Sequence, residues 1–449
     1  MSAFEVEGGK KLSGTVRISG NKNEALPCIA ASLLCKDPVT LTNVPDIGDV
    51  RSMLAIARKL GAKIVPSKDG RVTLDASSRL SSTLPLQLSS TIRGSVLFAS
   101  ALLVRTGKAI LPQPGGDTIG RRRLDTHFMV FKALGAKFST QRSKGKGGHT
   151  VTHILEAPNG LRGGTIYLDE ASVTATENAL IAASGARRQT IVANAASEPH
   201  VQGLCRFLQS LGVSIDGIGS NVLKVTPGKR SRARVTHALG CDYIEAGSFI
   251  GLAAATGSDL TIANVDPDTL RMILFQFSRL GVTTRVDRKK RTVRVPARQS
   301  LRVRKDLGGA IPRLEDSPWP GMPADLTSIM LVAATQARGT CLIHEKMFES
   351  RLFFVDTLIS MGAQIVLCDP HRAVVVGPSP LGGATITSPD IRAGMALLIA
   401  ALAAGGKSTI QNIVQIDRGY ERIDERLRAI GARISRSPDR RRNPGASGR

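Results

Sequence analysis

Several short segments of the chain place basic side chains beside carboxylates or amides, a combination that can bind an anion and move protons. Arginine forks match the paired oxygens of phosphate and carboxylate groups, and a nearby carboxyl group can give or take a proton. In SGNKNEALP, which runs from Ser19 to Pro27, Lys22 and Asn23 precede an apolar stretch. If that stretch is a buried helix, its N-terminus adds positive potential at Lys22. In a plain loop, both side chains are only solvated.

The segment PGGDTIGRRRLDTH, from Pro114 to His127, combines three glycines with an aspartate and three arginines. The glycines give the backbone the freedom of a lid that moves over a reaction centre. Asp117 is a candidate acid, and residues 121–123 form dense positive charge beyond it. A glycine turn with a cluster of surface charge is the alternative interpretation.

Further candidates are spread along the chain. Arg93 occurs in SSTIRGSV, Asp325 in SPWPGMPADLTS and Arg418 in IDRGYERI. Asp325 precedes the apolar stretch LTSIMLVAA, so a simple N-cap is the alternative to a catalytic base. Asp390 and Arg392, in SPDIRAG, are close enough to form a structural ion pair instead of contacting a substrate.

An internal repeat must position these loops. A triplet of a hydrophobic residue, glycine and a small residue follows an amphipathic stretch six times, at intervals of 69 to 81 residues. The triplets begin at Leu60, Leu134, Leu211, Leu280, Met361 and Ile430. The period is too long for a simple solenoid and suits a compact subdomain. The glycine is placed where a helix ends in a left-handed cap before a strand.

Each copy has the same internal order of patterns. A stretch of small apolar residues, such as SVLFASALLV, precedes a β-branched strand, a polar loop, an amphipathic helix, the glycine triplet and one or two strands. The alanine-rich stretches have no polar face, so we expect them to be helices buried inside a domain with sheets around them. The unit is therefore βαβαβ-like, and 449 residues favour two domains of three units each.

Composition excludes some classes of protein. The 42% hydrophobic and 22% charged residues are typical of a globular chain. The longest apolar stretch is shorter than the ~20 residues that cross a bilayer, and the N-terminus lacks the apolar region of a secretory signal. Six scattered cysteines without a CxxC pair predict no disulfide or metal framework. We therefore expect a cytoplasmic protein without membrane contact.

The formal net charge of +25 is partly local, because it is concentrated in residues 285–306 and in the segment after Ile434. Basic charge favours nucleic acid, anionic membranes or anionic small molecules as partners. Only 4% of residues are aromatic, which leaves few side chains for stacking on bases and argues against nucleic acid. Solvated basic hairpins are the favoured interpretation of both clusters.

The repeats together with SGNKN, PGGDTIG and IDRGYERI resemble the enolpyruvyl transferases, and among them the branch that uses an aminosugar nucleotide. The resemblance covers the chain up to about residue 434. It implies an α/β fold of two inside-out α/β domains, built from six βαβαβ-like repeats and facing across a cleft. The implied domains are 22–240, the discontinuous 1–21 plus 241–434, and a basic tail at 435–449 that we expect to be disordered.

The resemblance also implies an activity. The enolpyruvyl group of phosphoenolpyruvate is transferred to the 3-hydroxyl of UDP-N-acetylglucosamine with release of phosphate, which is the first committed step of peptidoglycan synthesis. No cofactor and no metal are implied, and nothing is implied about the oligomeric state. Asp325 is the implied base, with Asp117 and Lys22 as the implied acids.

The remaining implied roles are carried over position by position. Residues implied to bind phosphoenolpyruvate are Lys22, Arg93, Arg122 and Arg418. Residues implied to bind the acceptor are Asn23, Arg93, Arg122, Asp125, Ser172, Val173, Thr174, Asp325 and Met347. Residues implied at the cleft or in closure are Glu198, Asp242, Arg351, Asp390 and Arg392.

Three positions depart from the usual pattern of that branch. Asp117 replaces a cysteine, which keeps a proton donor but removes a thiolate. Arg123 replaces a proline in the uridine-binding segment, and Thr174 stands where glycine is common. The alternatives are a different acceptor, UMP or shikimate 3-phosphate, or a basic nucleic-acid-binding relative without this activity.

Overall fold

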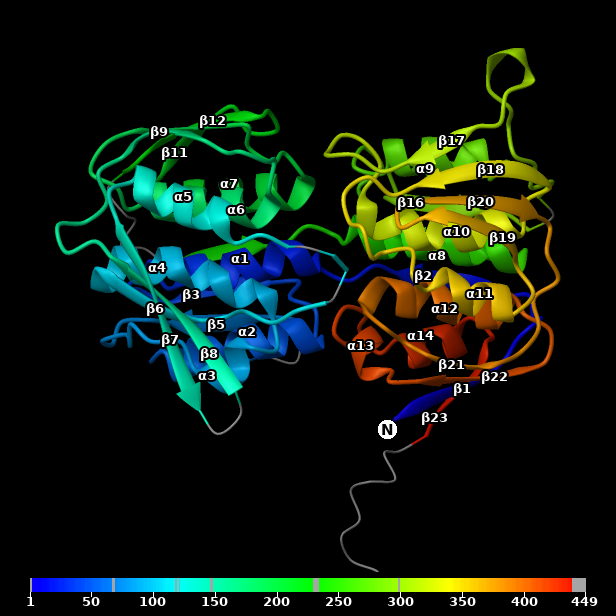
Figure 1. Cartoon of the computed structure of the whole chain (residues 1–449), viewed down its shortest axis with the longest axis horizontal. Coiled ribbons are helices and arrows are strands. Elements are labelled where there is room, and N and C mark those ends of the chain that lie inside the picture. Colours follow the sequence, from blue (N-terminus) through cyan, green and yellow to red (C-terminus); the bar gives the residue numbers. More distant parts are fainter. Residues whose placement is uncertain are drawn as a thin grey trace, which may run out of the picture. The chain divides into compact units, whose positions relative to one another are not determined.

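The computed structural model describes residues 2–66, 69–117, 119–120, 122–145, 148–228, 234–297 and 299–437. The chain forms two compact units (Figure 1). Unit 1 comprises residues 1–19, 118–121 and 241–449, and unit 2 comprises residues 20–117 and 122–240. The predicted tail at 435–449 needs correction at its start, because strand β23 extends to Ser437 by pairing with the N-terminal strand. Residues 438–449 lie outside the described residues.

The described strands form six small sheets, three in each unit. Unit 2 contains, in sheet order, β13 (Val235–Ala238), β3 (Val39–Thr42), β5 (Val72–Asp75) and β4 (Lys63–Pro66); β6 (Lys108–Pro112), β8 (Gly148–Glu156) and β7 (Lys137–Gly145); and β9 (Gly164–Tyr167), β10 (Thr190–Ala193), β12 (Val222–Thr226) and β11 (Ser214–Asp216). Unit 1 contains β2 (Ser13–Arg17), β14 (Asp259–Ala263), β16 (Thr292–Val295) and β15 (Arg285–Asp287); β17 (Arg313–Glu315), β18 (Gly339–His344), β20 (Arg372–Gly377) and β19 (Gln364–Asp369); and β21 (Thr385–Thr387), β22 (Lys407–Gln411), β1 (Ala3–Glu7) and β23 (Arg433–Ser437).

The sheets share one pairing scheme. In five of them a parallel pair is followed by two antiparallel strands, as in β9, β10, β12 and β11. In the sheet of β6 the parallel neighbour is reduced to one bridge between Thr83 and Ile110. Five of the six described sheets thus have one strand more than the predicted βαβαβ-like unit.

Helices fill the interior of each unit, and the sheets lie outside them (Figure 1). The buried helices are α1 (Lys22–Ser32), α4 (Phe98–Thr106) and α6 (Val173–Ala183) in unit 2, and α8 (Tyr243–Thr256), α10 (Thr327–Thr335) and α12 (Ile391–Ala403) in unit 1. Each repeat has a second helix, which follows the central strand in the sequence. These second helices are α2 (Gly48–Lys59), α5 (Asp125–Ala133), α7 (Pro199–Ser210), α9 (Arg271–Arg279), α11 (Val355–Ser360) and α14 (Ile423–Ala429). Shorter helices are α3 (Leu86–Ser89), α13 (Val414–Asp417), η1 (Arg93–Leu97), η2 (Leu307–Gly309) and η3 (Ala324–Leu326). The predicted inside-out α/β fold is confirmed.

Besides the segment 118–121, the chain passes between the two units at two points. These points are residues 19–20 and 240–241, whereas the sequence placed the first passage after residue 21. The parallel strand of the first repeat in unit 2 is β13, which is distant in sequence, and that of the first repeat in unit 1 is β2. In unit 2 the Asn21 amide donates to the Gly240 carbonyl at 2.8 Å, which fixes both chain segments beside the start of α1.

An asparagine marks the end of four central strands. These residues are Asn43, Asn194, Asn264 and Asn412, with φ between +56° and +60°. Each amide Nδ2 donates to the carbonyl just after the parallel neighbour strand, at 2.8 to 2.9 Å. Asparagine tolerates this left-handed conformation better than most residues. In the other two repeats, Gln113 and Glu345 follow the central strand instead.

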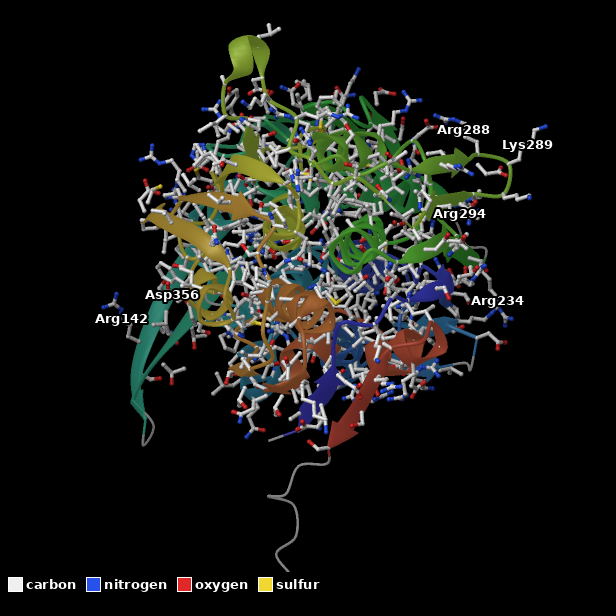
Figure 2. The ribbon with its side chains drawn as sticks, turned by 90° about the vertical axis from the view of Figure 1, so that its right-hand side faces the viewer. Arg142, Arg234, Arg288, Lys289, Arg294 and Asp356 are labelled. Atoms are coloured by element: carbon white, nitrogen blue, oxygen red, sulfur yellow. The ribbon has the colours of Figure 1, made fainter. Side chains whose placement is uncertain are left out.

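The basic segment 285–306 begins as a hairpin of β15 and β16. Figure 2 shows Arg288 and Lys289 projecting outward from its turn. Arg288 pairs with Asp268 at 2.7 Å and Arg294 with Asp259 at 2.9 Å, all at the surface. Among the described residues, no helix is long and apolar enough to cross a bilayer.

The close approach of α8 and α10 predicts sensitivity to an added methyl group. A Cβ atom at Gly251 would lie 2.4 Å from Cγ2 of Ile329, beside the ring of Phe277. We expect Gly251→Ala to lower the free energy of unfolding by about 1–3 kcal/mol, measured by urea denaturation. The control, Lys59→Ala at the exposed end of α2, should change it by less than about 0.5 kcal/mol. Equal stability of Gly251→Ala and the parent would show that α8 and α10 pack less closely.

Candidate active site

The candidate residues gather where buried helices begin. In unit 2, Lys22 and Asn23 open α1, whose cap is Asn21: its Oδ1 accepts from the Glu24 amide at 3.1 Å. In unit 1, Asp242 caps α8 by accepting from two amides of its first turn, at 2.9 and 3.0 Å. Free amides and the helix dipole make such ends favourable for anions. The fold therefore places these side chains where positive potential is highest.

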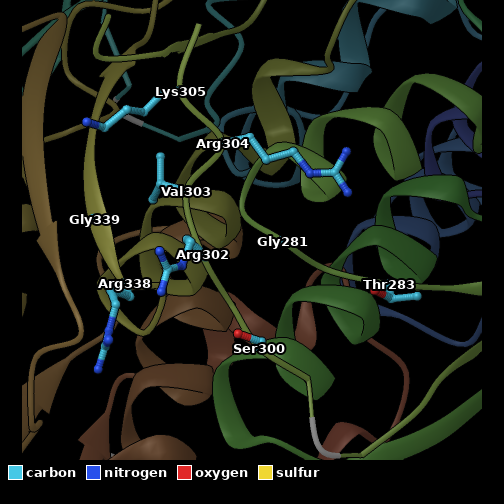
Figure 3. A pocket seen from close by; sticks show the side chains of 9 residues that line it. All are labelled: Gly281, Thr283, Ser300, Arg302, Val303, Arg304, Lys305, Arg338 and Gly339. Atoms are coloured by element: carbon cyan, nitrogen blue, oxygen red, sulfur yellow. The ribbon is translucent and has the colours of Figure 1, made fainter. Parts of the chain in front are cut away.

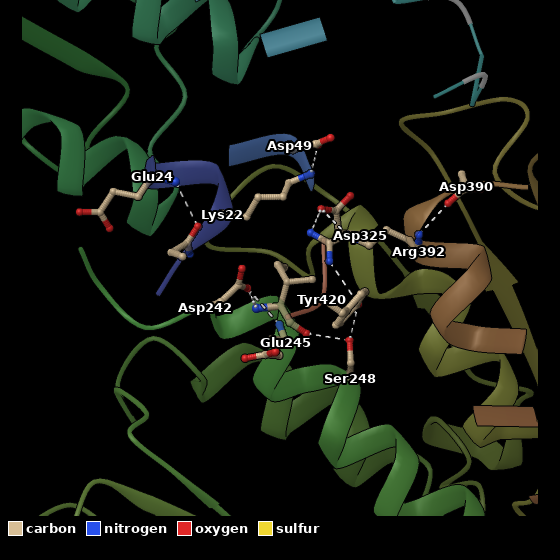
Figure 4. Close-up of polar contacts among 12 residues, drawn as sticks. Lys22, Glu24, Asp49, Asp242, Glu245, Ser248, Asp325, Asp390, Arg392 and Tyr420 are labelled. Carbon is tan, nitrogen blue, oxygen red and sulfur yellow. Dashed lines mark hydrogen bonds and ion pairs between the residues drawn. The ribbon is translucent and has the colours of Figure 1, made fainter. Parts of the chain in front are cut away.

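Lys22 is held by a partner that the sequence did not single out. Its Nζ lies 3.1 Å from Oδ2 of Asp49, in the first turn of α2, and the two side chains are only 11% and 6% exposed (Figure 4). The two residues are 27 positions apart. The position of Asp49, at the start of an amphipathic helix beside the loop, was the available signal. The pair orients the ammonium group and gives it a carboxylate with which to exchange a proton.

Arg93 and Arg122 both lie beside a glycine of the predicted lid. A Cβ atom at Gly116, where φ is +121°, would lie 3.0 Å from Cβ of Arg93 and 3.5 Å from Nη1 of Arg122. Arg93 opens η1 and donates through Nη2 to the Arg123 carbonyl at 2.5 Å. Burial, and then the charge of Arg122, lowers the pKa of Arg93 to about 10. Two neighbouring guanidinium groups that repel each other are stabilised by a bound anion.

The predicted lid is divided between the units. Asp117 is half-buried and follows Gly116 directly, so it lies beside the two arginines. Ile119 and Gly120 belong to unit 1, where the Ile119 carbonyl accepts from the Ser350 amide at 3.2 Å. Residues 118 and 121 lie outside the described residues, and Arg121, the first of the three arginines in this segment, is one of them.

Arg123 and Asp125 contact each other instead of standing apart. Nε of Arg123 lies 3.1 Å from Oδ2 of Asp125, and its Nη2 lies 2.9 Å from Oδ2 of Asp169. The Asp125 side chain is 63% exposed, so it stays accessible to a ligand. The arginine that replaces proline therefore forms an ion pair with a residue predicted to bind the acceptor.

A buried polar network lies behind these residues. Asn178 Nδ2 donates to Nδ1 of His127 at 2.8 Å and to the Val96 carbonyl at 3.2 Å, while Nε2 of His127 lies 3.3 Å from Oγ1 of Thr174. Because Nδ1 accepts, the proton of the neutral ring is on Nε2. Burial, and then the charge of Arg93, lowers the pKa of His127 to about 3. Thr174 thus contacts an uncharged histidine, and Asn178 has a structural role.

The other candidates of unit 2 also lie at helix starts. Ser172 precedes α6, Val173 packs against the core, and the Ser172 carbonyl accepts from Oγ1 of Thr176 at 2.8 Å. Glu198 precedes α7. Burial, and then the charge of Glu198, raises the pKa of Glu177 well above its usual range.

One group in unit 2 has metal-ligand chemistry, although the sequence predicted no metal site. The ligand atoms of Glu24, Cys28 and His237 lie within 4.8 Å of one another. Protein groups already occupy this carboxylate, since Nε2 of His237 lies 3.2 Å from it and the Gly240 amide donates to it at 3.1 Å. Burial raises the pKa of the Cys28 thiol well above its usual range, which disfavours the thiolate that a metal requires. The group therefore fits a structural contact at the start of α1.

In unit 1, Asp325 is held between two buried arginines, Arg351 and Arg392, of which Figure 4 shows Arg392. Its Oδ1 accepts from Nη2 of Arg351 at 3.1 Å, and its Oδ2 accepts from Nε of Arg392 at 3.1 Å. The Asp325 side chain is 29% exposed, whereas those of the arginines are 3% and 5% exposed. The carboxylate is thus oriented from behind and open on one side.

These contacts correct two alternatives: that Asp325 is only the N-cap of a helix, and that Asp390 and Arg392 form an ion pair. Asp325 lies within η3 and is not the cap of α10, which is Leu326. Asp390 is the cap of α12, where its Oδ1 accepts from the backbone amides of Arg392 and Ala393 at 2.7 and 2.9 Å. The guanidinium group of Arg392 pairs with Asp325 instead. The short loop before α12 leaves the Asp390 carboxylate in reach of those two amides.

A chain of side chains extends from Arg392 into the core. Nη1 of Arg392 donates to the Tyr420 hydroxyl at 3.2 Å, and that hydroxyl lies 2.9 Å from Oγ of Ser248. Burial alone would lower the pKa of Arg392. The charge of Asp325 and smaller contributions from neighbouring groups together outweigh burial, so the pKa rises. The guanidinium group is therefore permanently charged and fixed in position.

Behind Arg351 lies a carboxyl group that the sequence prediction missed. Oε2 of Glu345 is 3.7 Å from Nε of Arg351, and the Glu345 side chain is fully buried. Burial is the main cause that raises the pKa of Glu345 to about 8, and nearby Asp316 adds to it while Arg351 opposes it. Glu345 stands where four other repeats have asparagine, and that break in the pattern was the available signal.

The last two candidates lie on other elements of unit 1. Arg418 follows α13 and donates through Nη1 to Oε1 of Gln415 at 2.8 Å. Met347 lies in the loop after β18 and is 39% exposed. The structure therefore brings Asp325 together with Arg351 and Arg392, and it does not place Arg418 in that direct network.

The two groups have complementary chemistry. The arginine pair and the lysine of unit 2 suit an anion with phosphate or carboxylate oxygens. The ionised Asp325 of unit 1 can accept a proton from a hydroxyl group that approaches its open side. Taken separately, the group of unit 2 suits an anionic substrate and the group of unit 1 suits a hydroxyl acceptor.

Comparisons with known proteins agree with this chemistry. A family model described as EPSP synthase (3-phosphoshikimate 1-carboxyvinyltransferase) matches residues 6–427. A UDP-N-acetylglucosamine 1-carboxyvinyltransferase of Treponema denticola is 51% identical over 434 residues, covering 97% of this chain and 99% of the relative. A protein of the same name from Bradyrhizobium diazoefficiens is 52% identical over 440 residues, covering 98% and 99%.

Solved structures share the fold. The enolpyruvyl transferase NikO from Streptomyces tendae superposes with a TM-score of 0.83 at 26% identity, covering 97% of this chain and 99% of that chain. An EPSP synthase from Acinetobacter baumannii has a TM-score of 0.73 at 18% identity, covering 98% and 100%. The second likeness bears on the fold alone.

The raised pKa of Glu345 predicts a pH dependence of stability. A carboxyl whose folded pKa exceeds its unfolded value stabilises the fold fully below the unfolded pKa, near 4.5, and this contribution is lost as the pH rises through about 8. Glu345→Gln, which stays neutral, should therefore gain stability relative to the parent as pH rises from 5 to 8, by at most about 1.4 kcal/mol per pH unit. Urea denaturation across that range measures it. Glu425→Gln on exposed α14 is the control, and parallel curves for Glu345→Gln and the parent would contradict the expectation.

Proposed function

Because the chain belongs to the family of EPSP synthase (3-phosphoshikimate 1-carboxyvinyltransferase), we propose that it transfers the enolpyruvyl group of phosphoenolpyruvate to the 3-hydroxyl of UDP-N-acetylglucosamine, releasing phosphate. The relatives that carry this activity in their names match 97% or more of the chain at 51 to 52% identity. The observation that carries the chemistry is the Asp325 carboxylate, fixed by Arg351 and Arg392 and open on one side. The reaction is the first committed step of peptidoglycan synthesis, which we expect to occur in the cytoplasm.

Asp325 removes the proton from the acceptor hydroxyl. Each carboxylate oxygen accepts a hydrogen bond from an arginine, which leaves further lone pairs for a hydroxyl on the exposed side. The arginines hold the carboxylate in one orientation, which lowers the entropic cost of the transition state. Arg351 and Arg392 act through Asp325 and are positioning residues. Met347, which is exposed after β18, contacts the acceptor.

Phosphoenolpyruvate is bound by cations. Arg93 and Arg122 take phosphate or carboxylate oxygens, which relieves the repulsion between their guanidinium groups. Lys22 adds charge at the N-terminus of α1, and Arg418 supplies a further guanidinium group. Asn23, Asp125 and residues 172–174 provide polar groups for the acceptor at neighbouring helix starts. Asp242 and Asp390 cap the starts of α8 and α12, and Glu198 precedes α7.

The reaction proceeds by addition and elimination. The acceptor oxygen forms a bond to C2 of phosphoenolpyruvate while C3 gains a proton, from Asp117 or Lys22, and becomes a methyl group. The resulting tetrahedral phospho-ketal then loses a proton from that methyl group and breaks the bond between C2 and the bridging oxygen. Phosphate leaves with that oxygen, and the vinyl ether of the product remains. Cations that bind the phosphate stabilise its charge as it leaves.

The choice of acceptor is tested by direct competition. Purified protein is incubated with phosphoenolpyruvate and one of three acceptors, UDP-N-acetylglucosamine, UMP or shikimate 3-phosphate, and phosphate release is followed with the product mass. We expect release with the aminosugar nucleotide and a product heavier by one enolpyruvyl unit. Phosphate release with only UMP or only shikimate 3-phosphate would reassign the acceptor. No phosphate release with any of the three acceptors would refute the proposed transfer.

Removing the charge of Asp325 should stop catalysis without unfolding the protein. We expect Asp325→Asn to lower kcat by about 10²–10⁴-fold, with little change in the affinity for the acceptor nucleotide. Steady-state phosphate release and calorimetric binding measure the two quantities. Asp356→Asn, an exposed aspartate of α11 in the same unit, is the matched control and should keep the parent kcat. A change in KM alone for Asp325→Asn would exclude a role as the base.

The aspartate of the predicted lid determines the response to an epoxide. A carboxylate is a far weaker soft nucleophile than a thiolate, so fosfomycin should leave Asp117 unmodified and the enzyme active. Asp117→Cys should lose activity with time and gain the mass of one inhibitor molecule. Mass spectrometry of both proteins after incubation decides the matter, and a stable adduct on the parent chain would contradict the prediction.

A further inference from the structure

A cavity of about 650 Å³ lies in unit 1, apart from the Asp325 network (Figure 3). It lies between the glycine triplet after α9 and the start of β18, and nine residues line it. Arg302, Arg304, Lys305 and Arg338 are four of the nine, and the described lining includes no carboxylate and no aromatic side chain. Its volume falls within the ~300–1,000 Å³ typical of ligand sites.

These four cations differ from three arginines nearby in the same unit. Arg279 pairs with Asp306, Arg294 with Asp259 and Arg313 with Glu315, at 2.6 to 2.9 Å. In the described part of the chain, none of the four lining cations forms such a salt bridge. Positive charge that is gathered in a concave site without counter-charge raises the local concentration of anions.

The position of the arginines is set by the backbone. Arg302 and Arg338 face each other in a parallel bridge, reinforced by bonds from the Val303 amide to the Arg338 carbonyl (3.0 Å) and from the Arg338 amide to the Leu301 carbonyl (2.9 Å). Partners in a bridge project their side chains to the same face of the sheet. The two guanidinium groups therefore leave the backbone in the same direction.

The cavity depends on a connection that is longer than its counterparts. Residues 296–312 link β16 to β17, whereas residues 157–163 and 378–384 make the corresponding links in two other repeats. The Gly281 position contacts this connection closely, since a Cβ there would lie 2.5 Å from the Arg302 amide nitrogen. Within this longer connection, Arg302 forms the bridge to Arg338, and the Arg304 amide donates to the Arg279 carbonyl at 2.8 Å. This is the second half of the basic segment 285–306, which the proposed reaction does not use.

We propose that this cavity binds a small polyanion with two or more linked phosphate groups. Four uncompensated positive charges match such a ligand, and a single phosphate ion would fill only a small part of the volume. Guanidinium forks suit phosphate oxygens in pairs. Without an aromatic wall there is no platform for stacking a base, so recognition rests on the phosphates. The site is independent of the proposed enolpyruvyl transfer.

Calorimetric titration with inorganic tripolyphosphate tests the proposal on the full chain. We expect saturable binding that weakens between 50 and 200 mM salt, as charge-driven association does in proportion to its charge pairs. Arg302→Glu combined with Arg338→Glu should weaken it at least tenfold. The matched control is Lys289→Glu with Lys290→Glu, which changes the net charge equally on the β15–β16 turn outside the cavity. The control should change affinity less than twofold.

Further measurements distinguish an inorganic polyphosphate from a nucleotide as the ligand and test whether the variant is folded. Tripolyphosphate binding as tightly as ATP supports an inorganic polyphosphate, and tighter binding of ATP supports a nucleotide through the same phosphate chemistry. The paired arginine variant should keep the parent melting temperature and phosphate release from phosphoenolpyruvate. Equal weakening by both charge-reversal pairs, binding only of duplex DNA, or no saturable binding would overturn the proposal.

Discussion

Three alanine-rich helices pack against one another in the core of each unit, and this packing constrains everything around it. Helices buried on all sides expose almost nothing along their length, so side chains that can meet a ligand are found mainly at their ends. In three repeats the parallel strand, the buried helix and the central strand follow one another as a single crossover, so the helix begins after the carboxyl end of the parallel strand. Lys22, Asp242, Asp390 and residues 172–174 all lie at such starts. The concentration of candidate chemistry at these loops is thus a consequence of the buried core.

The Asp325 network shows how the core and the chemistry are connected. Arg392 belongs to the first turn of buried α12, and its guanidinium group reaches both Asp325 and the buried hydroxyl of Tyr420. Arg351 connects Asp325 to Glu345, which occupies the position that asparagine has in other repeats. A repeat position that normally ties two strands together is therefore used to support a charged site. Burying these arginines is tolerable because each is paired and hydrogen-bonded, and unpaired buried charges would be costly.

Much of the fold could be predicted because it depends on local pattern. Helices without a polar face, six glycine triplets and the strands between them are visible in the chain and are confirmed as an inside-out α/β fold. The partners of the site residues could not be predicted in the same way. Lys22 meets Asp49 across 27 residues, and Asp325 meets Arg392 across 67, so these contacts depend on how elements pack. Asp325 was favoured as a base from its motif alone, and its catalytic role stays a prediction. Glu345 was missed because a lone glutamate after a strand has no local signature.

The central claim is that the chain moves the enolpyruvyl group and not the phosphoryl group, and the fate of one oxygen atom distinguishes the two. Phosphoenolpyruvate labelled with ¹⁸O at the bridging ester oxygen is allowed to react with UDP-N-acetylglucosamine, and both products are examined by mass spectrometry. Addition and elimination break the bond between carbon and the bridging oxygen, so all of the label should appear in inorganic phosphate and none in the nucleotide product. Label retained on the carbon skeleton, with unlabelled phosphate, would mean that the phosphorus–oxygen bond had broken and would contradict the account.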